Sequence, residues 1–167
     1  EHEAKLLVDG VSSFGAEKIP FDNGTIAACA ATANKCIHGV PGTSFVLLKR
    51  SLFKDTGIPK RSVYLDLSKY LKAQDNKGTP FTQSVQSFYA LEEALKEFFD
   101  QGGRSARHEI YSHRMEKVSE TLHSLGIKPL LPLTSNSVVL RSFLLPPGKS
   151  YEKVHQSLKK QGFIIYR

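Results

Sequence analysis

One lysine stands in a setting that restricts what this chain can fold into. Lys35 follows a run of small and apolar residues, 26–33, of the kind that forms a buried strand. Glycine and proline at 39–42 then predict a tight turn, and a second apolar strand is expected at 44–48. An ammonium at the end of a buried strand is unusual, because burial is costly and lowers its pKa. Lys35 therefore either ends a strand and points into solvent, or reacts with an aldehyde in catalysis.

The composition is that of a folded protein with its own core. The chain has 167 residues, 40% of them hydrophobic and 23% charged, which is unlike a disordered chain. Its two cysteines, Cys29 and Cys36, show neither a disulfide framework nor the paired spacing of a zinc site. No apolar stretch is long enough to cross a bilayer. We therefore expect a cytoplasmic protein with no metal site and no membrane partner.

The formal net charge of +7 raises the question of an anionic partner. The densest basic groups are three separate dipeptides, at 49–50, 60–61 and 159–160, rather than one patch. This dispersal favours a solvated basic surface, and we expect no nucleic-acid partner. Nucleic-acid binding through the net charge stays a weaker alternative, which would weaken steeply as salt is added.

A carboxylate ends the first apolar run of the chain. Residues 5–8 have the form of a central parallel strand, and Asp9 stands at its carboxyl end, where open α/β sheets bind ligands. If this strand lies beside 26–33, Asp9 and Lys35 face the same edge of the sheet. That pair suits a ring cofactor, since the lysine bonds an aldehyde and the carboxylate keeps a ring nitrogen protonated. The alternative is that Asp9 only caps the following turn.

The rest of the chain predicts two helices and then a smaller unit. A helix is expected at 83–101, capped by Thr79 or Thr82, and a longer one at 104–125 with an apolar stripe. Residues 64–74 predict either a short helix or an irregular connection. Further on, strands are expected at 129–133, 138–145 and 163–166, and a helix at 151–161. The chain thus divides into residues 1–103, a connecting long helix at 104–126, and a small C-terminal α/β domain at 127–167.

Two sequence stretches resemble a known family. Residues 8–15 read Val-Asp-Gly-Val-Ser-Ser-Phe-Gly, and residues 33–42 read Ala-Asn-Lys-Cys-Ile-His-Gly-Val-Pro-Gly. In both stretches, and in the separation of Asp9 and Lys35 by 26 positions, the chain resembles the class V, fold-type I aminotransferases that use pyridoxal 5'-phosphate. Residues 78–82, Gly-Thr-Pro-Phe-Thr, also match this family, and the resemblance covers essentially the whole chain. It implies an α/β fold, in which part of a large domain with a mainly parallel sheet precedes a small α+β domain.

The resemblance implies a role for each of five residues. Lys35 corresponds to the lysine that forms the Schiff base with the cofactor and then moves a proton. Asp9 corresponds to the partner of the pyridine nitrogen, and Val11 to the residue that covers one face of the ring. Asn34 corresponds to a residue near the cofactor phosphate. Thr82 corresponds to a threonine that reaches the phosphate of the neighbouring subunit's cofactor, which implies a homodimer with shared sites.

The implied reaction moves an amino group from a small-molecule donor to a 2-oxo acid. Two classes of donor stay open: an aminophosphonate with pyruvate as acceptor, or alanine or serine with glyoxylate as acceptor. The family's phosphate-wrapping loop and its ring-stacking aromatic residue correspond to sequence upstream of this chain, and its substrate arginine to sequence downstream; Arg141 does not match that arginine. We therefore expect a piece of a longer protein that holds part of the site. The alternative is a non-catalytic fragment or dimerisation scaffold of the same fold.

Overall fold

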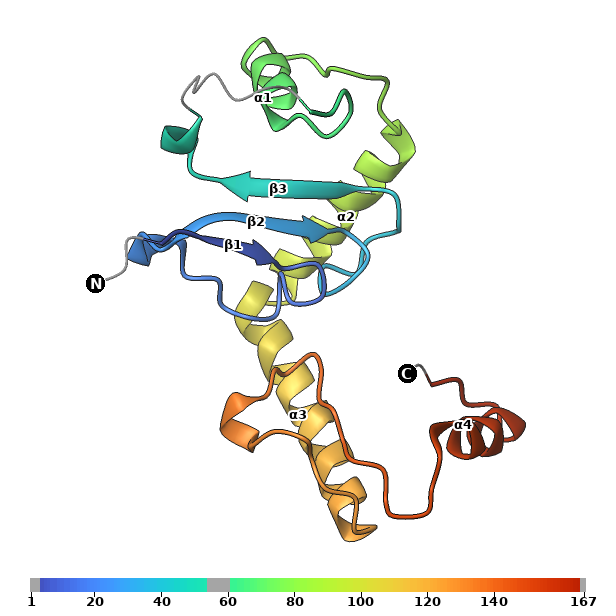
Figure 1. The fold of residues 1–167 in the computed structure, drawn as a ribbon. Helices are drawn as coiled ribbons and strands as arrows, with labels where there is room; N and C mark the ends of the chain where they lie inside the picture. Colours follow the sequence, from blue (N-terminus) through green and yellow to red (C-terminus); the bar gives the residue numbers. More distant parts are fainter. Residues whose placement is uncertain (1–3, 54–60, 166–167) are drawn as a thin grey trace. The chain divides into compact units, whose positions relative to one another are not determined.

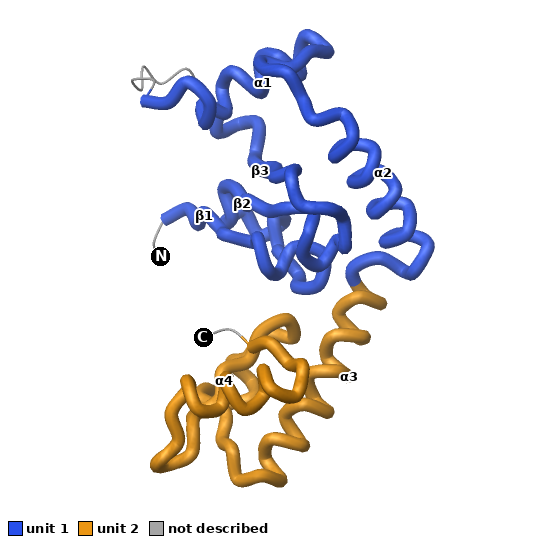
Figure 2. Tube along the Cα trace, turned by 90° about the vertical axis from the view of Figure 1, so that its right-hand side faces the viewer, with its two compact units in different colours: residues 1–104 blue, residues 105–167 orange. Residues whose placement is uncertain are grey.

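The computed structural model describes residues 4–53 and 61–165. By its internal contacts the chain divides into two units, residues 1–104 and residues 105–167, which Figure 2 draws in blue and orange. The first unit holds the strands and two of the α-helices, and the second holds most of the long helix and a shorter one (Figure 1). The assignment of residues 1–103, 104–126 and 127–167 to domains of a larger enzyme stays a prediction.

The first unit is built on a sheet of three strands in the order β1-β2-β3. They are β1 (Leu6–Asp9), β2 (Ile26–Thr32) and β3 (Ser44–Leu48). β2 is the central strand and most of it is buried, as its small apolar residues predict. β1 runs parallel to β2, with Asp9 beside Ala30 in the register. The carboxyl ends of these two strands therefore meet at one edge of the sheet, as the sequence predicted.

One expectation about this sheet was wrong. β1 was predicted to be central, but it is an edge strand of the described sheet, where Leu6 and Leu7 are 52% and 80% exposed. The mainly parallel sheet was predicted for a large domain of which this chain holds a part, and it stays a prediction. In the described sheet, β3 pairs with β2 in the antiparallel direction. The reason is the connection: residues 33–43 form a turn without a helix, and a parallel return needs a longer crossover.

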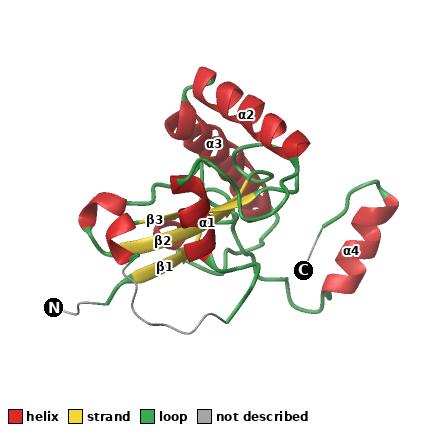
Figure 3. Cartoon of the chain, turned by 90° about the horizontal axis from the view of Figure 1, so that it is seen from above, coloured by secondary structure: helices red, strands yellow, loops and turns green. Residues whose placement is uncertain are grey.

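Helices complete the first unit. α1 (Leu67–Asp75) is a regular helix, and the Asp66 carboxylate caps it by accepting the backbone N–H of Ser68 at 2.9 Å. α2 (Val85–Asp100) runs along one face of the sheet, with Ala94 and Phe98 buried (Figures 1 and 3). Short 3₁₀ turns occupy Phe21–Asn23 and Arg50–Leu52.

The predicted cap of α2 was wrong. Ser84 is the N-cap residue, and its side chain makes no capping hydrogen bond. Thr79 instead donates its hydroxyl to the carbonyl oxygen of Phe81 at 2.9 Å, which stabilises the loop before the helix. Thr82 lies one residue further along this loop and is exposed. Competition of this kind between helix capping and local turns is usual for threonine.

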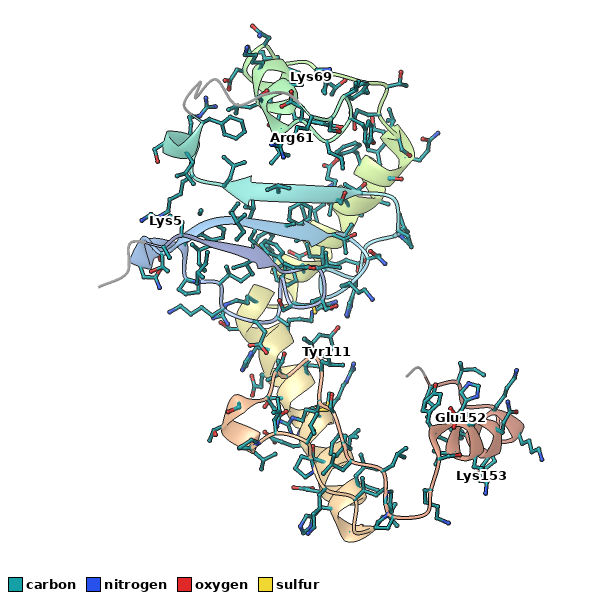
Figure 4. The ribbon with its side chains drawn as sticks, viewed as in Figure 1. Lys5, Arg61, Lys69, Tyr111, Glu152 and Lys153 are labelled. Atoms are coloured by element: carbon teal, nitrogen blue, oxygen red, sulfur yellow. The ribbon has the colours of Figure 1, made fainter. Side chains whose placement is uncertain are left out.

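The second unit contains α4 (Tyr151–Lys160) and nearly all of α3 (Gly103–Ser124). The Ser150 hydroxyl caps α4 by accepting the N–H of Lys153 at 3.3 Å, and Figure 4 labels Glu152 and Lys153 on this helix. The Tyr151 hydroxyl, in the first turn, donates to the carbonyl oxygen of Ile165 at 3.0 Å. This bond ties the segment after α4 back onto the helix.

The predicted strands of the second unit were wrong. Where 129–133 and 138–145 were expected to form strands, the structure has one isolated bridge between Pro129 and Phe143, and a 3₁₀ turn at Leu133–Ser135. Pro129 and Pro132 carry no N–H, so this stretch cannot build a regular ladder. The predicted strand at 163–166 is absent over 163–165, and residue 166 lies outside the described residues.

Candidate active site

Asp9 stands at the carboxyl edge of the sheet with its side chain exposed. Its Oδ1 accepts the backbone N–H of Val11 at 3.0 Å, so the carboxylate does cap the following turn. Capping and ligand binding are compatible here, because a carboxylate has two oxygens and about four acceptor positions. Val11 itself is half-buried and begins the loop that leads away from β1.

Gly10 brings the backbone after Asp9 unusually close to β2. Its N–H donates to the carbonyl oxygen of Ala30 at 2.8 Å, and a Cβ at this position would lie 2.6 Å from the Cys29 Sγ. Burial raises the pKa of the Cys29 thiol; a backbone hydrogen bond involving Gly10 opposes the rise, and the negative charge of Asp9 adds to it. Cys29 is therefore a protonated thiol that fills the space beneath the Asp9 turn.

The turn that carries Lys35 is closed by backbone hydrogen bonds. The N–H of His38 donates to the Lys35 carbonyl oxygen at 2.9 Å, and the N–H of Gly39 donates to that of Ala33 at 2.8 Å. A Cβ at position 39 would lie 3.1 Å from the Cβ and the carbonyl oxygen of Ala33, so only glycine fits there without displacement. His38 has a φ of 64°, which side-chain-bearing residues rarely adopt. The amine of Lys35 is thus presented on a tightly wound turn.

Lys35 and Asn34 are both exposed. β2 is largely buried and ends at Thr32, three residues before Lys35. A buried strand therefore precedes the lysine, as expected, but the lysine itself is not buried. The Thr32 hydroxyl lies 2.8 Å from the Asn34 Oδ1 and 3.0 Å from the Thr43 carbonyl oxygen. Thr32 therefore fixes both ends of the turn, and it orients the Asn34 amide.

The Asp9 loop (residues 10–15) and the Lys35 turn (residues 33–43) are fastened to each other. The thiol of Cys36 donates to the carbonyl oxygen of Ser12, with a Sγ–O distance of 3.2 Å. A Cβ at Gly15 would lie 3.4 Å from Cγ1 of Ile37, so the backbone of the Asp9 loop approaches the Lys35 turn closely. Asp9 and Lys35, which are far apart in sequence, are thereby carried on one packed layer.

An aromatic pair extends this layer beyond the Lys35 turn. Phe14, from the Asp9 loop, packs edge-on against Phe45 of β3, with ring centroids 5.2 Å apart and ring planes at 79°. The Asp9 loop therefore contacts both the Lys35 turn and β3 at this edge of the sheet.

Thr82 lies on a different segment, and no contact described in the structure joins it to the other four predicted residues. Its neighbour Phe81 packs against Tyr64, with centroids 5.2 Å apart, and the Lys69 ammonium lies 5.9 Å from the Phe81 centroid (Figure 4). The structure thus brings Asp9, Val11, Asn34 and Lys35 to one edge and leaves Thr82 apart from them. The functional roles of all five residues stay predictions.

The first turn of α2, just after Thr82, does approach the Lys35 turn. A Cβ at Gly42 would lie 3.0 Å from the Ser87 Oγ, and Ser87 is itself 2.9 Å from the Ser84 hydroxyl. The φ of Gly42 is 125°, which favours glycine. The loop that carries Thr82 is therefore linked to the Lys35 turn through the start of this helix.

Sequence reasoning missed two residues that pack against the candidate residues. Cys29 and Cys36 form no disulfide, and both are buried next to the candidate residues. The sequence gives no signal for this role, because it depends on what lies opposite each thiol in space. In the ranges 4–53 and 61–165, no group of three or more potential ligands could hold a metal ion, and no helix has the length and apolar character of a membrane span.

The donor set fits a flat ring cofactor that carries an aldehyde. An exposed amine and an exposed carboxylate stand at one edge of a sheet, and the glycine after the carboxylate lets the backbone approach closely. The amine is the group that bonds an aldehyde, and the carboxylate is the group that holds a proton on a ring nitrogen. Lys35 and Asp9 are therefore the residues that would hold such a group.

Known proteins are similar in sequence to this chain over nearly its whole length. No protein-family model matches the chain. The 2-aminoethylphosphonate–pyruvate transaminase of Syntrophobacter fumaroxidans is 37% identical over 167 residues, which cover 96% of this chain and 44% of that protein. The transaminase of the same name from Aeromonas hydrophila is 36% identical over 168 residues, which cover 97% of this chain and 44% of that protein. The chain thus spans less than half the length of these relatives.

Solved structures share the fold. An aspartate aminotransferase of subgroup IV from Thermus thermophilus has a TM-score of 0.81 at 22% identity, over 96% of this chain and 44% of that one. An alanine–glyoxylate aminotransferase from Nostoc sp. has a TM-score of 0.78 at 21% identity, over 94% of this chain and 42% of that one. The predicted resemblance is confirmed: the chain is similar in sequence to part of the 2-aminoethylphosphonate–pyruvate transaminases, and its fold is that of aminotransferases of known structure.

Proposed function

We propose that this chain belongs to a pyridoxal 5'-phosphate-dependent aminotransferase that moves the amino group of 2-aminoethylphosphonate to pyruvate. The products would be phosphonoacetaldehyde and alanine. One structural observation carries the proposal: Lys35 and Asp9 stand on two loops that are fastened together at one edge of the sheet. The homology supports it independently, because relatives at 36–37% identity carry the name of this activity.

Each of the two charged residues has a separate task in this reaction. Bound pyridoxal phosphate would supply an electron-withdrawing ring, which acidifies the substrate Cα. Lys35 would hold the aldehyde carbon through its Nζ, and once released it would carry a proton from the substrate Cα. Asp9 would keep the ring nitrogen protonated, since an ionised carboxylate raises the pKa of a nearby pyridinium. The Asp9 oxygen that does not accept the Val11 N–H is available for this task.

Three further residues complete the proposed site. Val11 would cover one face of the ring, Asn34 would approach the cofactor phosphate, and Thr82 would reach the phosphate in a neighbouring subunit. The separation of Thr82 from the other residues is compatible with this last role, since a residue that serves a partner's site need not lie near its own. A homodimer with shared sites, and a cytoplasmic location, are part of the proposal.

The choice of amino donor rests on sequence rather than on fold. The alanine–glyoxylate enzyme resembles the chain at 21% identity, a level at which only the fold is shared. The aminophosphonate enzymes are 36–37% identical over the whole match. We therefore favour 2-aminoethylphosphonate with pyruvate over alanine or serine with glyoxylate.

A reductive trapping experiment tests the lysine. The purified protein is mixed with pyridoxal phosphate, reduced with borohydride and digested, and the modified peptide is identified by mass spectrometry. We expect the cofactor on Lys35, and its loss in Lys35→Ala. Lys18→Ala is the matched control, because Lys18 is an exposed lysine of the same unit outside the site. Scattered labelling of surface lysines, unchanged in Lys35→Ala, would refute the assignment.

A donor competition experiment tests the substrate. Alanine formation from pyruvate is followed with 2-aminoethylphosphonate, and serine is then added as a competing donor with glyoxylate as acceptor. We expect the aminophosphonate to be the preferred donor, and preference for serine would reassign the chain within its family. Specific labelling of Lys35 without turnover of either donor would favour the non-catalytic alternative.

A further inference from the structure

We propose that Cys36 is a positioning residue, whose buried thiol holds the Lys35 turn against the loop that follows Asp9. This inference rests on the proposed function, because it assigns a task at the same site. Cys36 follows Lys35 directly in the chain, and its side chain points away from the exposed amine into the packed layer. A shift of Cys36 therefore shifts Lys35.

The contact made by the thiol is well defined. Cys36 is 3% exposed, and its Sγ donates to the Ser12 carbonyl oxygen at 3.2 Å, across 24 residues of sequence. Ser12 lies three residues after Asp9, on the loop that the Asp9 carboxylate itself caps through Val11. The Lys35 turn is thus joined to the Asp9 loop by the contact between the Cys36 Sγ and the Ser12 carbonyl oxygen.

Other contacts place the two segments up to the point where each strand ends. The ladder of β1 with β2 sets Asp9 beside Ala30, and the Gly10 N–H donates to the Ala30 carbonyl oxygen at 2.8 Å. Lys35 lies five residues beyond Ala30, on the turn that follows β2. The Cys36 thiol is a directional contact that joins this turn to the Asp9 loop.

The consequence for the site is geometric. A ring that is bonded to Lys35 at one end meets Asp9 at the other only if the two loops stand at the correct distance. A displacement of about 1 Å is enough to weaken catalysis strongly in sites of this kind. Cys36 touches neither ring nor substrate in this scheme, and it acts through the position of Lys35.

Three variants separate positioning from simple stability. Cys36→Ala removes the donor, and Cys36→Ser keeps a donor on a shorter side chain. Ala94→Ser is the control, because Ala94 is also a small buried residue, at 7% exposure, but it lies on α2 outside the two loops. The readouts are the dissociation constant for pyridoxal phosphate and the pH midpoint of the absorbance band of the Lys35 adduct.

We expect Cys36→Ala to bind the cofactor about twofold to fivefold more weakly, because a thiol is a weak donor and its loss lies within the range of a single hydrogen bond, and to shift the pH midpoint. Cys36→Ser should recover part of both changes, and Ala94→Ser should leave the midpoint unchanged. An unchanged midpoint in Cys36→Ala, or the same shift in Ala94→Ser, would overturn the proposal.

Amide hydrogen exchange tests the contact without cofactor. In Cys36→Ala, exchange should rise together at the amides of Val11 and His38, which belong to the two loops. If the wild-type protein forms no Lys35 adduct, the proposed function fails, while this measurement still decides whether Cys36 joins the loops. A rise in one loop alone, or in neither, would refute the positioning role.

Discussion

Replacement of Gly10 by alanine is the sharpest test of how the Asp9 turn is built. Gly10 is buried and directly follows Asp9, and its N–H is hydrogen-bonded to Ala30. An added Cβ would lie 2.6 Å from the Cys29 Sγ and 3.2 Å from the carbonyl oxygen of Ala30. Both distances are shorter than ordinary contacts, so either the β1 end or the Cys29 side chain must move.

The expected loss of stability in Gly10→Ala follows from the close packing around position 10. Insertion of one methyl group into a well-packed interior costs about 1–3 kcal/mol. Cys29 is 1% exposed on the central strand, and Ile19 closes the same space, with its Cδ1 3.4 Å from the added Cβ. We therefore expect Gly10→Ala to lower the free energy of unfolding by about 2–3 kcal/mol, at the upper end of that range.

The assay is urea unfolding followed by circular dichroism, in a double-mutant cycle with Cys29→Ala. Removal of the sulfur leaves room for the new methyl group, so the double variant should be more stable than the sum of the single changes predicts. We expect a coupling of about 1–2 kcal/mol. Gly78→Ala is the control: its Cβ would lie 3.7 Å from the nearest atom, so it should be neutral or slightly stabilising.

Two outcomes would refute this reasoning. If Gly10→Ala unfolds at the wild-type urea concentration, the close contact between Gly10 and Cys29 does not exist. If the two changes are strictly additive, the cost of Gly10→Ala comes from elsewhere, for example from the contact with Ala30.

The remaining predictions concern two polar links. The Arg50 guanidinium donates to both oxygens of Asp75, at 2.6 and 3.0 Å, and this hydrogen bonding lowers the pKa of the Asp75 carboxyl. Stability from this pair is therefore present above about pH 4 and is lost as the pH falls through the lowered pKa, so the difference in urea-unfolding free energy between wild type and Asp75→Asn should shrink as the pH falls below about 4. In the second unit, Arg141 donates to the Ser119 hydroxyl at 2.8 Å. Ser119→Ala should lower the unfolding free energy of that unit by about 1–2 kcal/mol, and equal urea midpoints would exclude this link.

The centre of the first unit could be predicted from sequence because local and long-range signals agree there. Small apolar residues at 26–32 favour a buried strand, and the glycine- and proline-rich turn favours a return. The parallel pairing of β1 with β2 was expected from the positions of Asp9 and Lys35, and it is observed. α2 and α3 were likewise predicted within two residues of their observed ends.

Elsewhere the pattern of apolar residues was misleading. Apolar residues at 129–133 and 138–145 suggested strands, but many of them are exposed, among them Leu130 at 55% and Leu140 at 68%. The apolar stripe expected on α3 is also not buried: the one buried residue of that helix is Arg107, while Ile110 and Val118 are 42% and 48% exposed. The spacing of apolar residues predicts which face of a strand or helix would be stabilised by burial, but it does not predict whether another segment covers that face.

In the candidate site, the sequence identifies the charged residues but not the residues that position them. Asp9 and Lys35 stand out because charged groups at the ends of apolar strands are chemically conspicuous. They are positioned by residues that carry no such signal, namely Gly10, Cys36 and Gly39, whose importance depends on what lies opposite them in space. Substitutions at these small positions should therefore alter cofactor geometry while both charged residues remain in place, and a scan restricted to charged residues would miss all three of them.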